Sequence, residues 1–219
     1  MTALGFEKIM GHLVETIRNT EISYAIEILE STHKLIVDQV ISGQDEIDIS
    51  PSSWGQQIKR LEVALPYGEG LIGKDKEKFV EIINIIATVE RTISALKWMK
   101  SKYPNATIRE CHPSTSDDKD GNDIVIIEKY GNVLARCEVT DVVSSKAGQN
   151  GKEKKDLKTL GCENFVPADS ISRYIATSSE FADTLSSKKR KWCDKHYRYI
   201  RHETVCGNRT VLLEVKPKA

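Results

Sequence analysis

Two acidic residues, Asp123 and Glu138, border a stretch rich in β-branched residues and are of the residue type that binds divalent cations. The stretch reads DIVIIEKY-GN-VLARCEVT, and a Gly-Asn pair between two apolar runs is typical of a β-hairpin with a tight turn. If Gly131 and Asn132 are the whole loop, Asp123 lies opposite Thr140, and Glu138 points to the same face of the sheet. The two carboxylates are then diagonal neighbours, roughly 7–8 Å apart at the backbone. A four-residue loop keeps this arrangement, whereas a three-residue loop destroys it.

Two carboxylates at the end of an otherwise apolar hairpin cost free energy unless a cation compensates their charge. Mg²⁺ is the natural candidate, because it takes a few carboxylate oxygens, keeps several waters and also binds substrate phosphate. We therefore expect a Mg²⁺ site at Asp123 and Glu138. An ordinary hairpin with two polar residues at its solvated rim explains the same residues without a metal.

Hydrophobic periodicity predicts the elements that must position this hairpin. Helices are predicted over 3–42 and over 74–102, and the second of them stops before Pro104. Ser178 or Ser179 would cap a further helix that begins at Glu180. The other predicted elements are strands over 106–111, 172–177, 197–203 and 210–216, and a helix over 153–160. The order from residue 74 is thus α-β-β-β-α-β-α-β-β, which predicts a mixed α/β sheet flanked by helices, with a parallel crossover after the strand that carries Glu138.

The hairpin begins with Asp123 on its first strand and ends with Glu138-Val139-Thr140 on its second. This arrangement resembles the PD-(D/E)xK nuclease superfamily, and within it the type II restriction endonucleases. The stretches EKKDLKTLG and RYIATSSEF are also similar to restriction endonuclease sequences. The resemblance covers residues 74–191 and implies a restriction endonuclease-like core, α-β-β-β-α-β. We expect residues 1–73 to form a helical region packed on the core, and residues 74–219 to form the nuclease-like core with a basic C-terminal β-hairpin.

The resemblance implies a Mg²⁺-dependent endonuclease that hydrolyses phosphodiester bonds at a short site in double-stranded DNA. Asp123 and Glu138, with the Val139 carbonyl, would hold the metal while water attacks the scissile phosphate in line. Thr140 stands where the family usually has Lys, which orients the water and stabilises negative charge, work that a hydroxyl does poorly. Either a nearby lysine replaces it, or the site is altered, or the chain binds DNA without cutting.

The linker after the hairpin and the basic C-terminal stretch are candidates for DNA contacts. Residues 141–152 are rich in small residues and precede a helix, an arrangement that suits phosphate binding but is also typical of an ordinary surface loop. Residues 186–202 interleave cations with aromatic residues, which suits phosphates and bases, although a basic helix end followed by an amphipathic strand has the same pattern. The predicted DNA-binding residues are Ser144, Lys146, Lys152, Lys155, Lys188, Arg190, Lys191, Arg198 and Arg201, of which Lys146 and Lys152 are also the candidates to replace the missing lysine.

A second Glu-x-Lys motif occurs at Glu214-Val215-Lys216. With 207–208 as the turn of the last hairpin, Glu214 lies opposite Arg201, and no Asp stands at the partnering position. We therefore predict a cross-strand ion pair worth a few tenths to about 1 kcal/mol, and not a metal site.

Charge is unevenly distributed along this chain of 219 residues, although its formal net charge is zero. Residues 1–50 hold nine acidic and three basic residues, whereas residues 183–219 hold ten basic and four acidic ones. This asymmetry is expected if only the C-terminal part meets a polyanion, and solvated helix faces would give it too.

The five cysteines are widely spread and contain no CxxC motif, which favours a reducing compartment over a disulfide framework. The chain begins with no basic leader followed by an apolar run, and no apolar run reaches the length of a membrane span. We expect a cytoplasmic protein without a membrane partner. If its DNA site is palindromic, a two-fold homodimer follows from symmetry.

Overall fold

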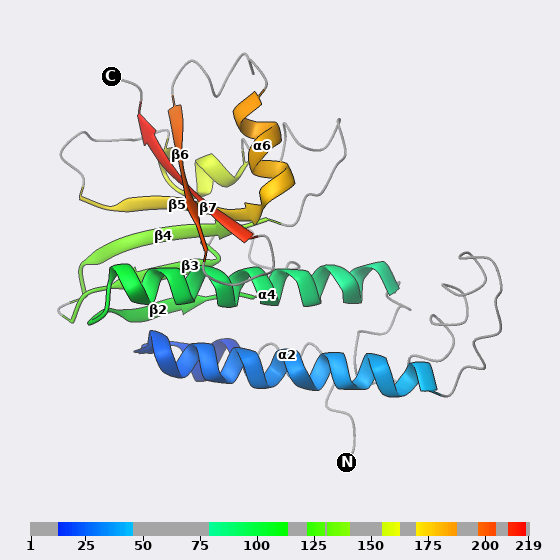
Figure 1. Ribbon diagram of the computed structural model, residues 1–219. Coiled ribbons are helices and arrows are strands. Elements are labelled where there is room, and N and C mark those ends of the chain that lie inside the picture. The colour runs from blue at the N-terminus through cyan, green and yellow to red at the C-terminus, as the bar shows by residue number, and fades with distance from the viewer. Residues whose placement is uncertain are drawn as a thin grey trace.

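The computed structural model describes residues 13–45, 79–113, 122–129, 131–140, 155–162, 170–187, 197–204 and 210–217. Within these ranges seven strands form one open sheet in the order β1-β2-β3-β4-β5-β7-β6. Figure 1 labels β2 to β7 of this sheet. The strands are β1 (Thr20–Glu21), β2 (Thr107–Cys111), β3 (Ile124–Ile127), β4 (Val133–Val139), β5 (Ser172–Ser178), β6 (Tyr197–Glu203) and β7 (Thr210–Pro217). Only β4 and β5 are parallel, and the other neighbours are antiparallel. The predicted mixed α/β sheet with a parallel crossover after β4 is confirmed.

Helices pack on both faces of the sheet. The helices are α2 (Ile22–Asp45), α4 (Phe79–Lys102), α6 (Ser179–Ser187) and two short helical segments over 13–17 and 155–159. One core joins α2 and α4 to alternate strand residues such as Ala135, Cys137 and Tyr174. A second core joins the 155–159 helix and α6 to the intervening residues, among them Ile175 and Leu213. Successive strand residues point to opposite faces, so the two cores lie on opposite sides of the sheet.

The N-terminal helical prediction is wrong at residues 18–21. Residues 13–17 are helical, Asn19 then takes a left-handed conformation (φ 58°), and β1 pairs with β2 before α2 begins. Asn adopts this conformation more readily than most residues. The Thr20 hydroxyl donates to the Ile17 carbonyl (2.7 Å) and so satisfies a group at the helix end. Residues 3–12 of the predicted helix lie outside the described ranges.

The two long helices, α2 and α4, lie side by side on one side of the sheet (Figure 1). Cys137 packs in the same core as these helices, so they cover the sheet face that carries it. Lys97 contacts Glu30 (2.6 Å), and His33 contacts Glu90 (3.0 Å), between α4 and α2. These partly exposed pairs contribute little, so the buried apolar stripe holds the helices together. As predicted, α4 ends before Pro104, which has no N–H to continue the helix. Within the described ranges no helix is both long and apolar enough to cross a membrane.

The hairpin of β3 and β4 exists as predicted, but its loop and register differ. Glu128 N donates to Asn132 O (2.9 Å), so three residues of the sequence separate this pair, the last of them Gly131 at φ 88°. A three-residue loop alone would separate Asp123 and Glu138 onto opposite faces. However, Ile127 pairs with Val133 while Ile126 pairs with Ala135, which leaves Leu134 as an extra residue in a β-bulge. The bulge shifts the register by one and returns the two acidic residues to the same face.

The C-terminal hairpin has a register one residue away from the prediction. Glu214 pairs with Ile200 in β6, not with Arg201, and the predicted Arg201 ion pair is therefore wrong. This register places Tyr197 beside Val215 and Leu213 in the second core. It turns Glu214 toward α4, where the carboxylate accepts from Lys216 Nζ (2.6 Å) and His202 Nε2 (3.1 Å).

The side chain of Glu214 is expected to make the protein sensitive to acid. Burial alone would raise the pKa of this carboxyl group, but hydrogen bonds from Lys216 and His202 and the charge of Lys102 lower it below its ordinary value. The folded state therefore binds the proton more weakly than the unfolded chain, so this stability is present above the unfolded pKa of about 4.3 and is lost as pH falls through the folded pKa. We expect Glu214→Gln to cost about 1–3 kcal/mol at pH 7.

Urea unfolding of the parent and Glu214→Gln between pH 7 and pH 3 tests this expectation. The difference in unfolding free energy should shrink as the pH falls below about 4, because both proteins then carry a neutral group at this position. A difference that stays constant with pH would contradict it. Glu30→Gln, which removes a carboxylate from a half-exposed ion pair on α2, serves as the control with a small effect.

Candidate active site at the end of the β3–β4 hairpin

Asp123 and Glu138 come together at the end of the hairpin that lies away from its loop. The register pairs Ile124 with Cys137, and one step further places Asp123 beside Glu138. The two acidic residues are thus direct cross-strand neighbours, closer than the diagonal arrangement predicted from a two-residue loop. Asp123 Oδ2 also accepts a hydrogen bond from the Val139 backbone N–H at 2.6 Å. The side chain of Asp123 therefore extends the pairing of β3 and β4 by one bond.

Burial differs between the two carboxylates. Glu138 is only 5% exposed, whereas Asp123 is partly exposed, so a ligand from solvent would meet Asp123 first. Burial, together with the charge of Asp123, raises the pKa of the Cys111 and Cys137 thiols on the neighbouring strands. These thiols stay protonated at neutral pH and act as core residues. Burial also raises the pKa of Cys162 to about 12, and all three thiols are free.

The donor atoms at this end of the sheet fit Mg²⁺ by their chemistry. Mg²⁺ prefers hard oxygen ligands, which two carboxylates supply. The N–H and C=O of one strand residue point to the same side, so the Val139 carbonyl lies on the side where its N–H meets Asp123. Thr140 adds a buried hydroxyl that has no hydrogen-bond partner in the described ranges. In these ranges no group of three or more His, Cys, Asp or Glu residues gathers as a metal site, so neutral oxygens would have to complete the ligand set.

Thr140, the residue that the sequence resemblance aligns with a lysine, lies directly after β4. Its backbone N–H donates to Ala176 O (2.9 Å) and continues the parallel ladder into β5. Its side chain is 1% exposed and shares a sheet face with Glu138, two residues earlier. The candidate replacements Lys146 and Lys152 lie outside the described residues.

Three of the predicted DNA-binding residues fall within the described ranges. Lys155 is exposed on the 155–159 helix, and Arg198 is exposed on β6 opposite Lys216. Arg201 is the third. The remaining ones, Ser144, Lys146, Lys152, Lys188, Arg190 and Lys191, lie outside the described ranges.

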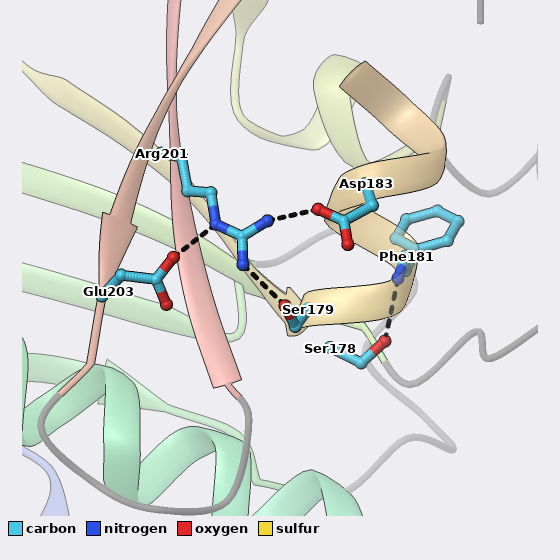
Figure 2. A network of polar contacts seen from close by, with 6 residues as sticks. All are labelled: Ser178, Ser179, Phe181, Asp183, Arg201 and Glu203. Atoms are coloured by element: carbon cyan, nitrogen blue, oxygen red, sulfur yellow. Dashed lines mark hydrogen bonds and ion pairs between the residues drawn. The ribbon is translucent and has the colours of Figure 1, made fainter. Parts of the chain in front are cut away.

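The guanidinium group of Arg201 is held by groups of its own chain (Figure 2). It donates to Asp183 Oδ1 (2.5 Å), Glu203 Oε1 (2.5 Å) and Ser179 Oγ (2.6 Å). The hydrogen bond to Glu203 is the main reason why the pKa of Arg201 is raised, and the bond to Asp183 adds to it. The network joins β6 to the first turns of α6. Contact with a DNA phosphate would require Arg201 to break its hydrogen bonds to these carboxylates, so its predicted role in DNA binding would cost the free energy of those bonds.

The short elements around the site are fixed by local hydrogen bonds. Ser178 Oγ accepts from Phe181 N (3.1 Å), which confirms the predicted N-cap of α6 (Figure 2). Arg173 is buried, and its guanidinium donates to Leu160 O (2.9 Å) and Ile171 O (2.9 Å). It thereby holds the end of the 155–159 helix against β5. The sequence prediction missed Arg173, since a single arginine in an apolar strand does not reveal its partners.

A second residue missed from the sequence is Thr177. It lies in β5 on the face of Glu138 and is fully buried, yet its hydroxyl has no hydrogen-bond partner within the described part of the chain. The parallel register, which pairs Val139 with Ala176, places it beside Thr140. A buried Thr in a β-strand is common, so only the pairing of β4 with β5 distinguishes this one.

Together, the fold and this arrangement describe a mixed α/β protein with two acidic residues side by side at the end of a central strand pair. Comparison with protein-family models, curated proteins and solved structures finds no match. The function is therefore inferred from the residues of this chain.

Proposed function

We propose that the protein is a Mg²⁺-dependent DNA endonuclease, similar to type II restriction enzymes, that hydrolyses phosphodiester bonds at a short site in double-stranded DNA. The observation that carries the proposal is the register at the end of the hairpin, which brings Asp123 beside Glu138. Two carboxylates on one sheet face, one buried and one partly exposed, suit a cation that is shared with a phosphate.

The element order supports the same proposal. The succession of α4, β2, β3, β4, the 155–159 helix and β5 is the α-β-β-β-α-β order that the resemblance implies. The parallel pairing of β4 with β5 follows the strand that carries Glu138. These features favour a restriction endonuclease-like core over other mixed α/β folds.

In the proposed mechanism Asp123, Glu138 and the Val139 carbonyl would hold the metal. A bound Mg²⁺ supplies positive charge that activates water and stabilises the leaving oxygen. The chain contributes to the geometry: the Val139 N–H donates to the Asp123 carboxylate, and the side chain of Glu138 is buried. Thr140 stands where a lysine would otherwise orient the attacking water.

The partners follow from this chemistry. Double-stranded DNA is the proposed substrate, and two copies of the chain related by two-fold symmetry would read a palindromic site. Exposed Lys155 and Arg198, with the basic residues around 188–191, are the proposed phosphate and base contacts. The buried free thiols suit a reducing cytoplasm, which we propose as the compartment.

A plasmid-nicking assay tests the function, with Mg²⁺ or EDTA and with the parent beside Thr140→Lys. We expect cleavage in Mg²⁺ and none in EDTA, and we expect Lys at position 140 to raise the rate by about 10²-fold, because a cation there stabilises charge in the transition state. Because Thr140 is buried, circular dichroism and a thermal melt must first show that the variant folds.

The second candidate function is a nuclease-like module that binds DNA without cutting it. Thr140 favours this reading, as does the use of Asp123 to bind a backbone N–H. DNA binding that depends on salt, with no cleavage by either the folded parent or the folded Lys variant, would support the module and refute the endonuclease.

A further inference from the structure

Two buried threonine hydroxyls lie on the Glu138 face of the sheet, close to the proposed site. Thr140 follows β4 and is 1% exposed, and Thr177 lies in β5 and is 0% exposed. Among the residues that the structure describes, neither Oγ1 atom has a hydrogen-bond partner. A buried hydroxyl without a partner costs free energy, so native proteins rarely leave two of them unsatisfied.

The two hydroxyls are close neighbours. Val139 pairs with Ala176 in the parallel ladder, and the Thr140 N–H donates to Ala176 O, so the next residues in register are Thr140 and Thr177. Neighbouring strands lie about 4.8 Å apart, and residues in register point to the same face. Glu138 is on this face two residues before Thr140 and pairs with Ile175, two residues before Thr177. One small molecule can therefore contact both hydroxyls and the carboxylate.

Several other threonine hydroxyls in the described residues donate to backbone carbonyls. Thr92, also fully buried, donates to Thr88 O at 2.9 Å, and Thr20 donates to Ile17 O at 2.7 Å. Thr177 lies in β5 and Thr140 directly follows β4, and the neighbouring carbonyl of Ala176 already accepts the Thr140 N–H. No group in the described part of the chain satisfies the two hydroxyls, so a bound water is the candidate partner for both.

We propose that Thr140 and Thr177 together hold one water molecule beside Glu138, and that this water is the one placed to attack the scissile phosphate. The role of this water in attack rests on the proposed endonuclease function. Each hydroxyl can donate and accept, and the carboxylate of Glu138 is a third acceptor, which gives the water the two to four partners of a typical buried water. On attack the water oxygen bonds to phosphorus, and the bond from phosphorus to the leaving sugar oxygen breaks. The attacking water releases one proton to solvent, and the leaving oxygen takes one proton from solvent. Thr177 is then a positioning residue that supplies, with Thr140, part of what one lysine would supply.

A double-mutant cycle with valine tests the water-holding pair without any need for activity. Valine has the shape of threonine but no hydroxyl, so Thr140→Val, Thr177→Val and the double variant remove the water's partners one at a time. We expect each single variant to lower the midpoint of thermal unfolding by about 2–4 °C. The double variant should lower it by no more than one of them, because the first replacement already releases the water. Thr177→Ser, which keeps the hydroxyl, should retain more stability than Thr177→Val.

Two results would refute the proposal that Thr140 and Thr177 hold one water together. Val variants that raise the unfolding midpoint would show that the hydroxyls had no partner at all, and additive losses would show that they have separate partners. Thr92→Val is the matched control: it removes a satisfied buried hydroxyl on α4, and its effect should add to that of Thr177→Val.

Plasmid nicking by the same variants tests the role in attack. We expect Thr177→Val to reduce kcat at least tenfold while KM for the plasmid stays unchanged, and Thr177→Ser and Thr92→Val to keep most of the parent's kcat. If the parent cuts and Thr177→Val cuts equally fast, the role in attack is refuted. If the parent does not cut but the stability cycle shows coupling, the endonuclease proposal fails and the water-holding pair stands.

Discussion

Replacing Asp123 by alanine is expected to abolish metal-dependent DNA cleavage, with a loss of at least about 10³-fold in rate. The carboxylate is the more exposed of the two acidic residues and the one that a phosphate and its cation would meet first. Metal-ion stabilisation of the transition state is worth several kcal/mol, and each 1.4 kcal/mol is a factor of about ten in rate. The measurement is plasmid nicking in Mg²⁺ at substrate saturation.

Asp123→Asn is the matched control for this prediction. Its amide oxygen can still accept the Val139 N–H, so the hairpin should keep its stability, whereas Asp123→Ala loses that bond and about 1–2 kcal/mol. Both variants lack the negative charge, and both should lose Mn²⁺ binding measured by calorimetry. Cleavage by Asp123→Asn at the parent's rate would show that the charge has no role, and would refute the metal site at this position.

Replacing Tyr174 by alanine is expected to cause the largest loss of stability, about 3–5 kcal/mol. Tyr174 is fully buried between α4 and the C-terminal strands. Its ring packs edge-on against Trp98 (5.2 Å between centroids) and near His202 (6.4 Å), and its hydroxyl contacts Lys102 Nζ and Tyr103 Oη at 2.5 and 3.2 Å. Alanine leaves a cavity at the point where α4, β5 and β6 meet. Urea unfolding should show a lower midpoint with an unchanged slope.

Tyr174→Phe separates the ring from the hydroxyl. We expect a loss of only about 1 kcal/mol, because Lys102 is exposed enough to be solvated instead, while Tyr103 loses one partner. Burial raises the pKa of Tyr103 to about 12, so this hydroxyl stays protonated over the range of the experiment. Equal losses for Phe and Ala would show that the hydroxyl, and not the ring, holds this junction together.

Local sequence signals were sufficient for most of the elements. The predicted strand 197–203 has the observed bounds, and the predicted strands 172–177 and 210–216 each end one residue early. Period-two alternation and flanking turn residues specify such strands locally. Ser178 caps α6 because a hydroxyl one residue before a helix can accept an orphan N–H, which is also a local effect. The break at residues 18–21 was missed because apolar residues continue on both sides of Asn19 at a spacing that helices share.

For the candidate site, the sequence by itself determined which residues could bind a cation: Asp123 and Glu138 at the ends of two adjoining strands. The tertiary structure decided that they face the same way. The loop alone would have separated them, but Ile124 and Ile126 must share the buried face with Ala135 and Cys137 against the long helices. A bulge at Leu134 restores that match, since the gain from burying one whole face exceeds the cost of one irregular pair. Likewise, no local pattern pairs Thr140 with Thr177, because 36 intervening residues separate them and only the parallel alignment of β4 and β5 brings them together.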